Sequence, residues 1–175
     1  MDLSDAVHAQ HLAELALMDA AMQAEDFTTE LLHPSDELPI ASLLVALGED
    51  DEQRQRAMSI SIMPFDEADF TATQFIQFYV PIPFEVTSDK MGDLGHAIAI
   101  VNGAMALGHF GVRGNELFYR YMLAADAGDV ISSEMLIELV SMMAFHQEHF
   151  ADYLEGVLDG EIELVILPKL IQQSS

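Results

Sequence analysis

The chain has 175 residues, the length of one domain with one hydrophobic core, so we expect a single domain over residues 1–175. Six Lys and Arg stand against thirty Asp and Glu, a formal net charge of −24, which disfavours nucleic acid and anionic membranes as partners. The hydrophobic fraction of 51%, the short apolar runs, the absence of cysteine and an N-terminus without signal-peptide character predict a folded cytoplasmic protein.

The first predicted element is an amphipathic helix from Ser4, a fitting cap, to about Ala24. The segment is rich in Ala, Leu and Met and contains no Gly or Pro. Its apolar residues recur every three or four positions. They are Leu12, Leu15, Met18 and Met22.

Four strands are predicted next, over residues 27–32, 39–47, 56–64 and 74–84, with the acidic run 49–52 as a solvated loop. In the last two, apolar residues alternate with small or polar ones, the pattern of a half-buried strand. The inward set is Met58, Ile60, Ile62, Ile76, Phe78, Val80, Ile82 and Phe84.

Pro81 and Pro83 interrupt the fourth strand. Because proline has no N–H and the two residues are two apart, both missing donors fall on the same edge of the strand. We therefore expect either an edge strand or a strand that is about to leave the sheet, with a ladder that weakens at this point.

A second helix is predicted from a Ser88 cap to about Leu107, ended by Gly108. A two-residue turn at Gly114-Asn115 then predicts a hairpin. In its simplest register, Phe110 faces Tyr119 and Val112 faces Leu117 on the core side, while Arg113 faces Glu116 on the other.

The last long helix is predicted from Ser132 or Ser133 to Leu158. Its expected buried stripe is Leu139, Met143, His146, Phe150, Tyr153 and Val157. Residues 161–168 fit a short strand or a helical tail, and the Ile and Val content favours the strand. From about residue 168 we expect a frayed tail.

The predicted order is therefore α-β-β-β-β-α-β-β-α with short connections. This order is typical of an α+β fold in which an antiparallel sheet carries its helices on one face.

The segment Leu94 to Phe110, with Ile98, Val101-Asn102 and the closing Gly108-His109-Phe110, followed by a hairpin and a long helix, resembles the YbjN-like family. The same order of elements is that of class I type III secretion chaperones. The resemblance covers about residues 75–160. It implies a compact, dimer-forming domain that binds other proteins or takes part in regulation, with no known catalysis. It does not decide between a secretion chaperone and a signalling accessory.

Two histidine pairs, His8 with His11 and His146 with His149, have the three-residue spacing that lets a helix present both rings to one metal ion. Neither pair lies in a Glu-x-x-His or His-Glu-x-x-His pattern, so a third and fourth ligand must come from elsewhere. We predict no metal and no cofactor. His146, on the apolar stripe, is expected to be hydrogen-bonded inside or at an interface and to titrate abnormally.

No other catalytic pattern emerges. There is no cysteine and no Gly-x-Ser-x-Gly elbow, and the glycines of residues 108–114 surround a hairpin instead of a phosphate-binding helix start. With thirty acids, no carboxylate pair can be singled out. We predict a protein that is not an enzyme.

Strand alternation sends a few large side chains to the face opposite the helices. They are Phe75, Tyr79, Phe118 and Met122. Flexible methionines also suit adaptable surfaces, although most should pack in the core. The candidates are Met58, Met63, Met122, Met142 and Met143. We expect a protein partner or a second copy of the chain to cover this face, unless a loop or the C-terminal segment does so.

Two hypotheses follow. The first is a non-enzymatic, homodimeric protein-binding, chaperone-like or regulatory domain. The alternative is a small metal-binding enzyme or metal-dependent regulator, which requires that the pairs His8/His11 and His146/His149 come together.

Overall fold

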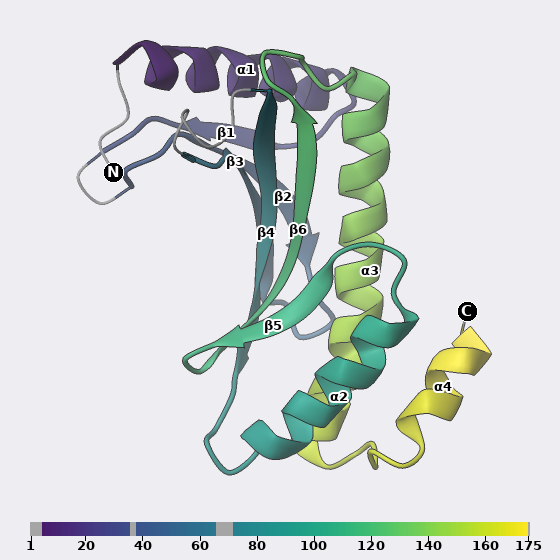
Figure 1. Ribbon diagram of the computed structural model, residues 1–175. Coiled ribbons are helices and arrows are strands. Elements are labelled where there is room, and N and C mark those ends of the chain that lie inside the picture. Colours follow the sequence, from purple (N-terminus) through teal and green to yellow (C-terminus); the bar gives the residue numbers. More distant parts are fainter. Residues whose placement is uncertain (1–4, 36–37, 66–71, 175) are drawn as a thin grey trace.

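The computed structural model describes residues 5–35, 38–65 and 72–174 (Figure 1). In chain order the elements are α1 (Asp5–Ala24), β1 (Thr29–Leu32), β2 (Ser42–Glu49), β3 (Gln55–Ile62), β4 (Thr73–Glu85), α2 (Met91–Ala104), β5 (His109–Arg113), β6 (Glu116–Asp126), α3 (Ser133–Asp159) and α4 (Leu167–Ser174). The predicted Ser4 cap lies outside the described residues.

The strands of the described chain form one antiparallel sheet of six strands, in the order β1-β2-β3-β4-β6-β5. At one end α1 crosses β1, β2 and β3, and α3 runs along the sheet (Figure 1). The core lies between these helices and the inward residues of the strands. The α+β class and the order α-β-β-β-β-α-β-β-α are therefore confirmed, with α4 as an addition.

The alternation of apolar residues in β3 and β4 places one row of side chains in the core. Met58, Ile60, Ile76, Phe78 and Val80 are fully buried. Ser59 and Tyr79, which pair with each other in the register, point to the opposite side and are only partly buried. The sheet thus has a helix-covered face and an open face.

The prolines of β4 do not mark an edge strand, because β4 is central and lies between β3 and β6. The expected weakening of the ladder is confirmed. Pairing with β3 ends at Tyr79, and the register with β6 breaks between Pro81 and Glu85. The strand stays in the sheet to Glu85, but where the proline N–H groups are missing it pairs with β6 alone and irregularly.

The second helix begins later than expected and without the predicted Ser88 cap. Residues 88–90 form a turn, closed by a bond from the Lys90 N–H to the Thr87 carbonyl, and α2 starts at Met91 with no side-chain cap. The hairpin that follows has the predicted register, with Phe110 opposite Tyr119 and Arg113 opposite Glu116.

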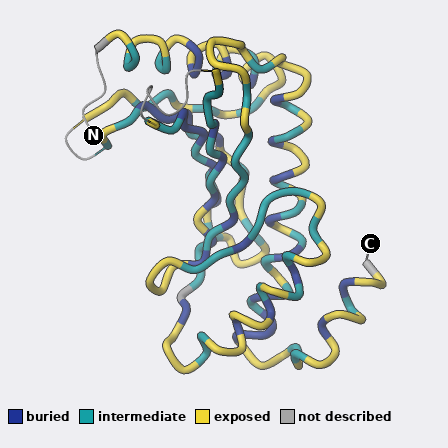
Figure 2. The backbone as a smooth tube through the Cα atoms, in the orientation of Figure 1, coloured by how far each residue is buried: buried dark blue, intermediate teal, exposed yellow. Residues whose placement is uncertain are grey.

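The cap of α3 is Ser132, whose hydroxyl accepts a hydrogen bond from the Met135 N–H at 3.2 Å. The buried stripe is rotated from the expected one. Met143, Phe150 and Val157 are buried as predicted, but Leu139, His146 and Tyr153 lie at the margin. The core side is completed by Leu136, Val140, Gln147 and Leu154 (Figure 2).

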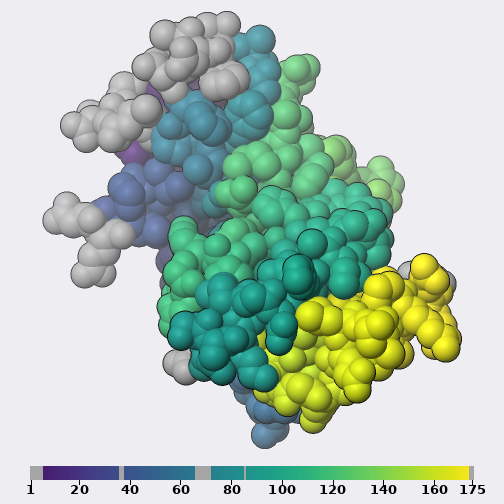
Figure 3. Space-filling view, turned by 60° about the horizontal axis from the view of Figure 1, so that its bottom comes forward, coloured from purple at the N-terminus to yellow at the C-terminus, as the bar shows by residue number. Residues whose placement is uncertain are grey.

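The expected C-terminal strand and frayed tail are wrong, since residues 167–174 form α4. Gly160, with φ of 78°, ends α3, and the N–H groups of Glu161 and Ile162 both bond to the Gly156 carbonyl. This turn folds the Ile162 side chain back over Gly156. Leu167 and Ile171 are buried, and α4 packs against α2 (Figure 3).

Candidate binding surface on the open face of the sheet

The predicted partner-binding residues lie on the open face. Phe75, Tyr79, Phe118 and Met122 are partly buried, and none of them packs against the helix-covered core. No helix among the described residues covers this side of the sheet. The residues of this face on β4, β5 and β6 form what we call the open-face cluster. Its members are Phe75, Tyr79, His109, Arg113, Phe118, Arg120 and Met122.

The centre of the cluster is a pair of stacked rings. The ring centroids of Tyr79 and Phe118 are 5.3 Å apart, with 27° between the planes. The Arg113 guanidinium lies 5.7 Å from the Tyr79 ring centroid, and its Nη2 donates to the Tyr79 hydroxyl at 3.3 Å. The Arg120 guanidinium lies 5.9 Å from the Phe118 centroid. Two cations therefore flank one aromatic pair, an arrangement that favours the charged guanidinium groups.

Gly111 determines where the Phe118 ring lies. The two residues are opposite each other on β5 and β6, and a Cβ atom at Gly111 would come within 2.5 Å of the Phe118 Cζ atom. The ring thus lies across the bare glycine of the edge strand, with His109 edge-on to it at 6.4 Å. The neighbouring strand supports the aromatic pair, but no layer covers its outer side within the described chain.

Phe75 and Met122 share the face without joining the stack. Phe75 contacts Phe65 edge-to-face at 5.1 Å between centroids, and Met122 lies opposite Gln77. The structure therefore brings two of the four predicted residues into mutual contact and places the other two further along the same strands.

The electrostatics of this face differ from those of the chain as a whole. Arg113 reaches Glu116 only at 4.0 Å, between two well exposed side chains, so that pair contributes little. Arg120 has no carboxylate within ion-pair distance among the described residues, and its buried Nε lacks a hydrogen-bond partner there. Burial, together with the charge of Arg120, lowers the pKa of His109. The His109 Nε2 atom lies 3.5 Å from the Arg120 guanidinium.

The basic part of this cluster was not predicted from the sequence. Arg120 and His109 join Tyr79 only because β6 lies between β4 and β5, an order that the periodicity of one strand does not reveal. The sequence did contain an indication for Arg120. It lies two residues from Phe118 and two from Met122, so strand alternation puts all three side chains on the same face.

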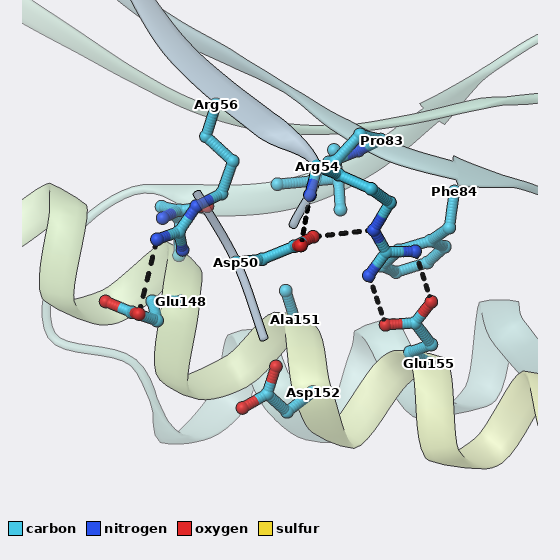
Figure 4. A pocket seen from close by; sticks show the side chains of 11 residues that line it. Asp50, Arg54, Arg56, Pro83, Phe84, Glu148, Ala151, Asp152 and Glu155 are labelled. Atoms are coloured by element: carbon cyan, nitrogen blue, oxygen red, sulfur yellow. Dashed lines mark hydrogen bonds and ion pairs between the residues drawn. The ribbon is translucent and has the colours of Figure 1, made fainter. Parts of the chain in front are cut away.

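Two other arginines are bound elsewhere and hold α3 to the β2–β3 connection (Figure 4). Arg54 donates from Nη1 and Nη2 to the two carboxylate oxygens of Glu155 at 2.6 and 2.7 Å, and from Nε to Asp50 at 2.6 Å. Arg56 is almost fully buried and reaches Glu148 at 3.2 Å. Arg54 and Arg56 are therefore paired closely with carboxylates, whereas Arg113 and Arg120 on the open face are not.

The histidine pairs do not converge. The C-terminal part of α1 around Ala21 and Ala24 meets the start of α3, whereas His8 and His11 lie at the other end of α1. Among the residues that the structure describes, no group of three or more His, Cys, Asp or Glu is placed to hold a metal ion. The alternative hypothesis lacks the convergence that it requires.

His146 behaves as expected in one respect only. Burial, and then the charge of nearby His149, lower the pKa of His146. Its buried Nδ1, however, has no hydrogen-bond partner in the described part of the chain, contrary to the expectation of a bonded ring.

No protein-family model and no curated protein sequence matches the chain. Within the described ranges, none of the helices combines the length and apolarity needed to cross a bilayer.

Proposed function

We propose that this chain is a non-enzymatic, cytoplasmic protein-binding domain of the chaperone-like or regulatory kind, and that it is a homodimer whose two copies meet through their open faces. The observation that carries the proposal is the Tyr79–Phe118 stack, flanked by Arg113 and Arg120 on a sheet face without a helical cover. Stacked aromatic and guanidinium groups are the side chains that most often anchor protein interfaces.

The charge distribution across this face makes it complementary to itself. One row of the sheet runs from Glu30 on β1 through Leu44, Ser59 and Tyr79 to Arg120. Glu30 is exposed, and Leu44 is partly buried without packing against the core. The row is therefore acidic at the β1 end, apolar in the middle and basic at the β6 end.

A two-fold axis parallel to the strands, in the plane between two such faces, places β1 of one copy over the β6 side of the other. In that arrangement Glu30 approaches the partner's Arg120 while the apolar middles bury each other. Face-to-face packing thus brings a carboxylate to Arg120, which has none within ion-pair distance among the described residues. The implied likeness to the YbjN-like family, whose members form dimers, supports the same proposal.

The test is the mass of the protein in solution by light scattering, with a monomer of 19.3 kDa as the reference. Wild type is expected at twice the monomer mass. The double variant Tyr79→Ser with Phe118→Ser is expected as a monomer. Arg120→Glu and Glu30→Arg, at the basic and acidic positions of this row, should each weaken the dimer, and the two together should restore it because the charges are exchanged.

A wild-type monomer at micromolar concentration would contradict the homodimer. A dimer that is insensitive to the serine and charge variants would place the interface elsewhere. Elemental analysis of the same samples tests the rival function: stoichiometric metal that is lost in His146→Ala with His149→Ala would favour the metal-dependent regulator.

A further inference from the structure

The outward side of α3 carries an apolar stripe that the core does not use. Met135, Met142 and Phe145 are 42%, 47% and 61% exposed. Met135 and Met142 are two turns apart, and Phe145 follows three residues later, so the three side chains lie along one side of the helix. The buried residues Leu136, Val140 and Met143 lie on a different side of the helix. We call the exposed set the α3 stripe.

Acidic side chains border the stripe. Glu134 and Glu138 are exposed on the same helix, one position before Met135 and four before Met142. The sequence of α3 contains no Lys or Arg. The α3 stripe is therefore apolar with carboxylates along it, and it belongs to a chain with a net charge of −24.

The side chains of the stripe suit a helical ligand. Methionine is flexible and polarizable, so Met135 and Met142 can adapt to the shape of an apolar partner. Phe145 is held in place by stacking on the His149 ring, with 5.6 Å between centroids and 5° between planes. A pre-positioned aromatic group next to adaptable methionines is a surface on which the apolar side of an amphipathic helix can pack.

The charge around the α3 stripe decides whether a second copy of the chain or a different protein binds there. A second copy would bring Glu134 and Glu138 against the same carboxylates of its partner, and like charges in contact disfavour that pairing. Lysine-rich flanks have the opposite effect, because their alkyl stems cover apolar surface while the ammonium groups reach the carboxylates.

We propose that the α3 stripe binds an amphipathic helix with basic flanks that a partner protein presents. This inference gives the partner class for the proposed protein-binding function. It uses a surface separate from the open face, so each can fail without the other.

The experiment uses the full chain and a dye-labelled peptide of about 18 residues, five helical turns, with leucines on one side and lysines on the other. Fluorescence anisotropy is expected to show saturable binding of one peptide per chain, weakened by salt. A peptide with glutamates in place of the lysines is expected not to bind.

The decisive variant is Met142→Ser with Phe145→Ser, which leaves every charge in place. It is expected to reduce affinity by at least about tenfold, as loss of interface anchors does. The matched control is Val165→Ser, at a site that is 79% exposed and lies outside α3, and it should bind like wild type. Thermal unfolding should be the same for all three proteins, because the replaced side chains lie outside the core.

If Met142→Ser with Phe145→Ser binds the basic peptide like wild type, the attraction is only diffuse charge and the proposal is wrong. The open-face variant Tyr79→Ser with Phe118→Ser should keep full peptide affinity while losing the dimer. Conversely, the α3 variant should keep the mass of the wild type. The two proposals are thereby tested separately.

Discussion

Asn102 and Phe110 exchange two hydrogen bonds. The Asn102 Nδ2 atom donates to the Phe110 carbonyl at 3.0 Å, and the Phe110 N–H donates to Asn102 Oδ1 at 2.8 Å. Phe110 belongs to the edge strand β5, where outward backbone groups have no neighbouring strand. The side-chain amide of Asn102, on α2, thus takes the place of a further strand. It keeps this part of the sheet edge from pairing with a strand of another chain.

Replacing Asn102 by Ala leaves the outward N–H and carbonyl of Phe110 without these partners. We expect the free energy of unfolding to fall by about 2 kcal/mol, the usual cost of stranding buried backbone groups. Urea unfolding at pH 7 measures it. The control is His96→Ala, an exposed position on the same helix that should change little. Equal effects of the two substitutions would contradict the role of Asn102.

Gly108 and Gly114 offer a matched pair of substitutions. Both have positive φ, 70° and 67°. An added Cβ meets the Tyr119 hydroxyl at 2.5 Å at Gly108 but has nothing within 4 Å at Gly114. That hydroxyl also donates to the Leu107 carbonyl at 2.7 Å.

Gly114→Ala should therefore cost only the backbone strain of a left-handed residue, about 1 kcal/mol. Gly108→Ala should cost clearly more, because the Tyr119 ring must also move. Thermal unfolding of the two variants gives the comparison. Equal losses of stability would show that the contact with Tyr119 is unimportant.

Asn102 and Gly108, two residues of the segment from Leu94 to Phe110, both serve to attach α2 and β5 to the core. Their spacing therefore reports architecture and is silent on the partner. The hairpin register was predictable for a similar reason: a two-residue turn and strand alternation are local properties.

Long-range order was not predictable in the same way. The place of β4 in the middle of the sheet, the bond between Arg54 and Glu155, and the meeting of Tyr79 with Arg120 all depend on which strands and helices become neighbours. Period two assigned Tyr79 and Phe118 to one face, and it put Arg120 on the same face as Phe118. It carried no information on which strands would become neighbours and so bring Arg113 and Arg120 to these two rings.

The hydrogen bonds of the Asp50 carboxylate predict that the protein loses stability in acid. Its burial disfavours the charged form, but the backbone N–H and guanidinium of Arg54 bond to the carboxylate and hold the pKa of Asp50 below its usual value. A pKa that is lower in the folded state than in the unfolded state stabilises the fold above the unfolded value. This stabilisation is lost as the pH falls through the folded value.

Asp50→Asn should accordingly lower the free energy of unfolding at pH 7, by about 1.5 kcal/mol for bonds to a charged group. The difference from wild type should shrink as the pH falls below about 4. Urea unfolding across this pH range tests the sign. Glu52→Gln, an exposed carboxylate in the same turn, is the control and should run parallel to wild type.

Asp152, in the same region, is expected to have the opposite effect of pH on stability. Burial, and then the charges of Asp51, Glu148 and Glu155, raise the pKa of Asp152, and Arg56 only partly offsets them. The folded state therefore holds this proton more tightly than the unfolded state does. Stability decreases as the pH rises from the unfolded pKa through the folded one, and the charged form weakens the fold at pH 7.

Asp152→Asn should raise the free energy of unfolding at pH 7. The gain should be small, about 0.5 kcal/mol, because the side chain is in contact with solvent and its repulsion is screened. Below about pH 3, where the carboxyl is protonated in both states, the gain should disappear. Glu163→Gln, an exposed site beyond α3, removes the same charge as a control. A variant that is less stable than wild type at pH 7 would mean that Asp152 contributes an attractive interaction, with Arg56 as the nearest source, that outweighs its three acidic neighbours.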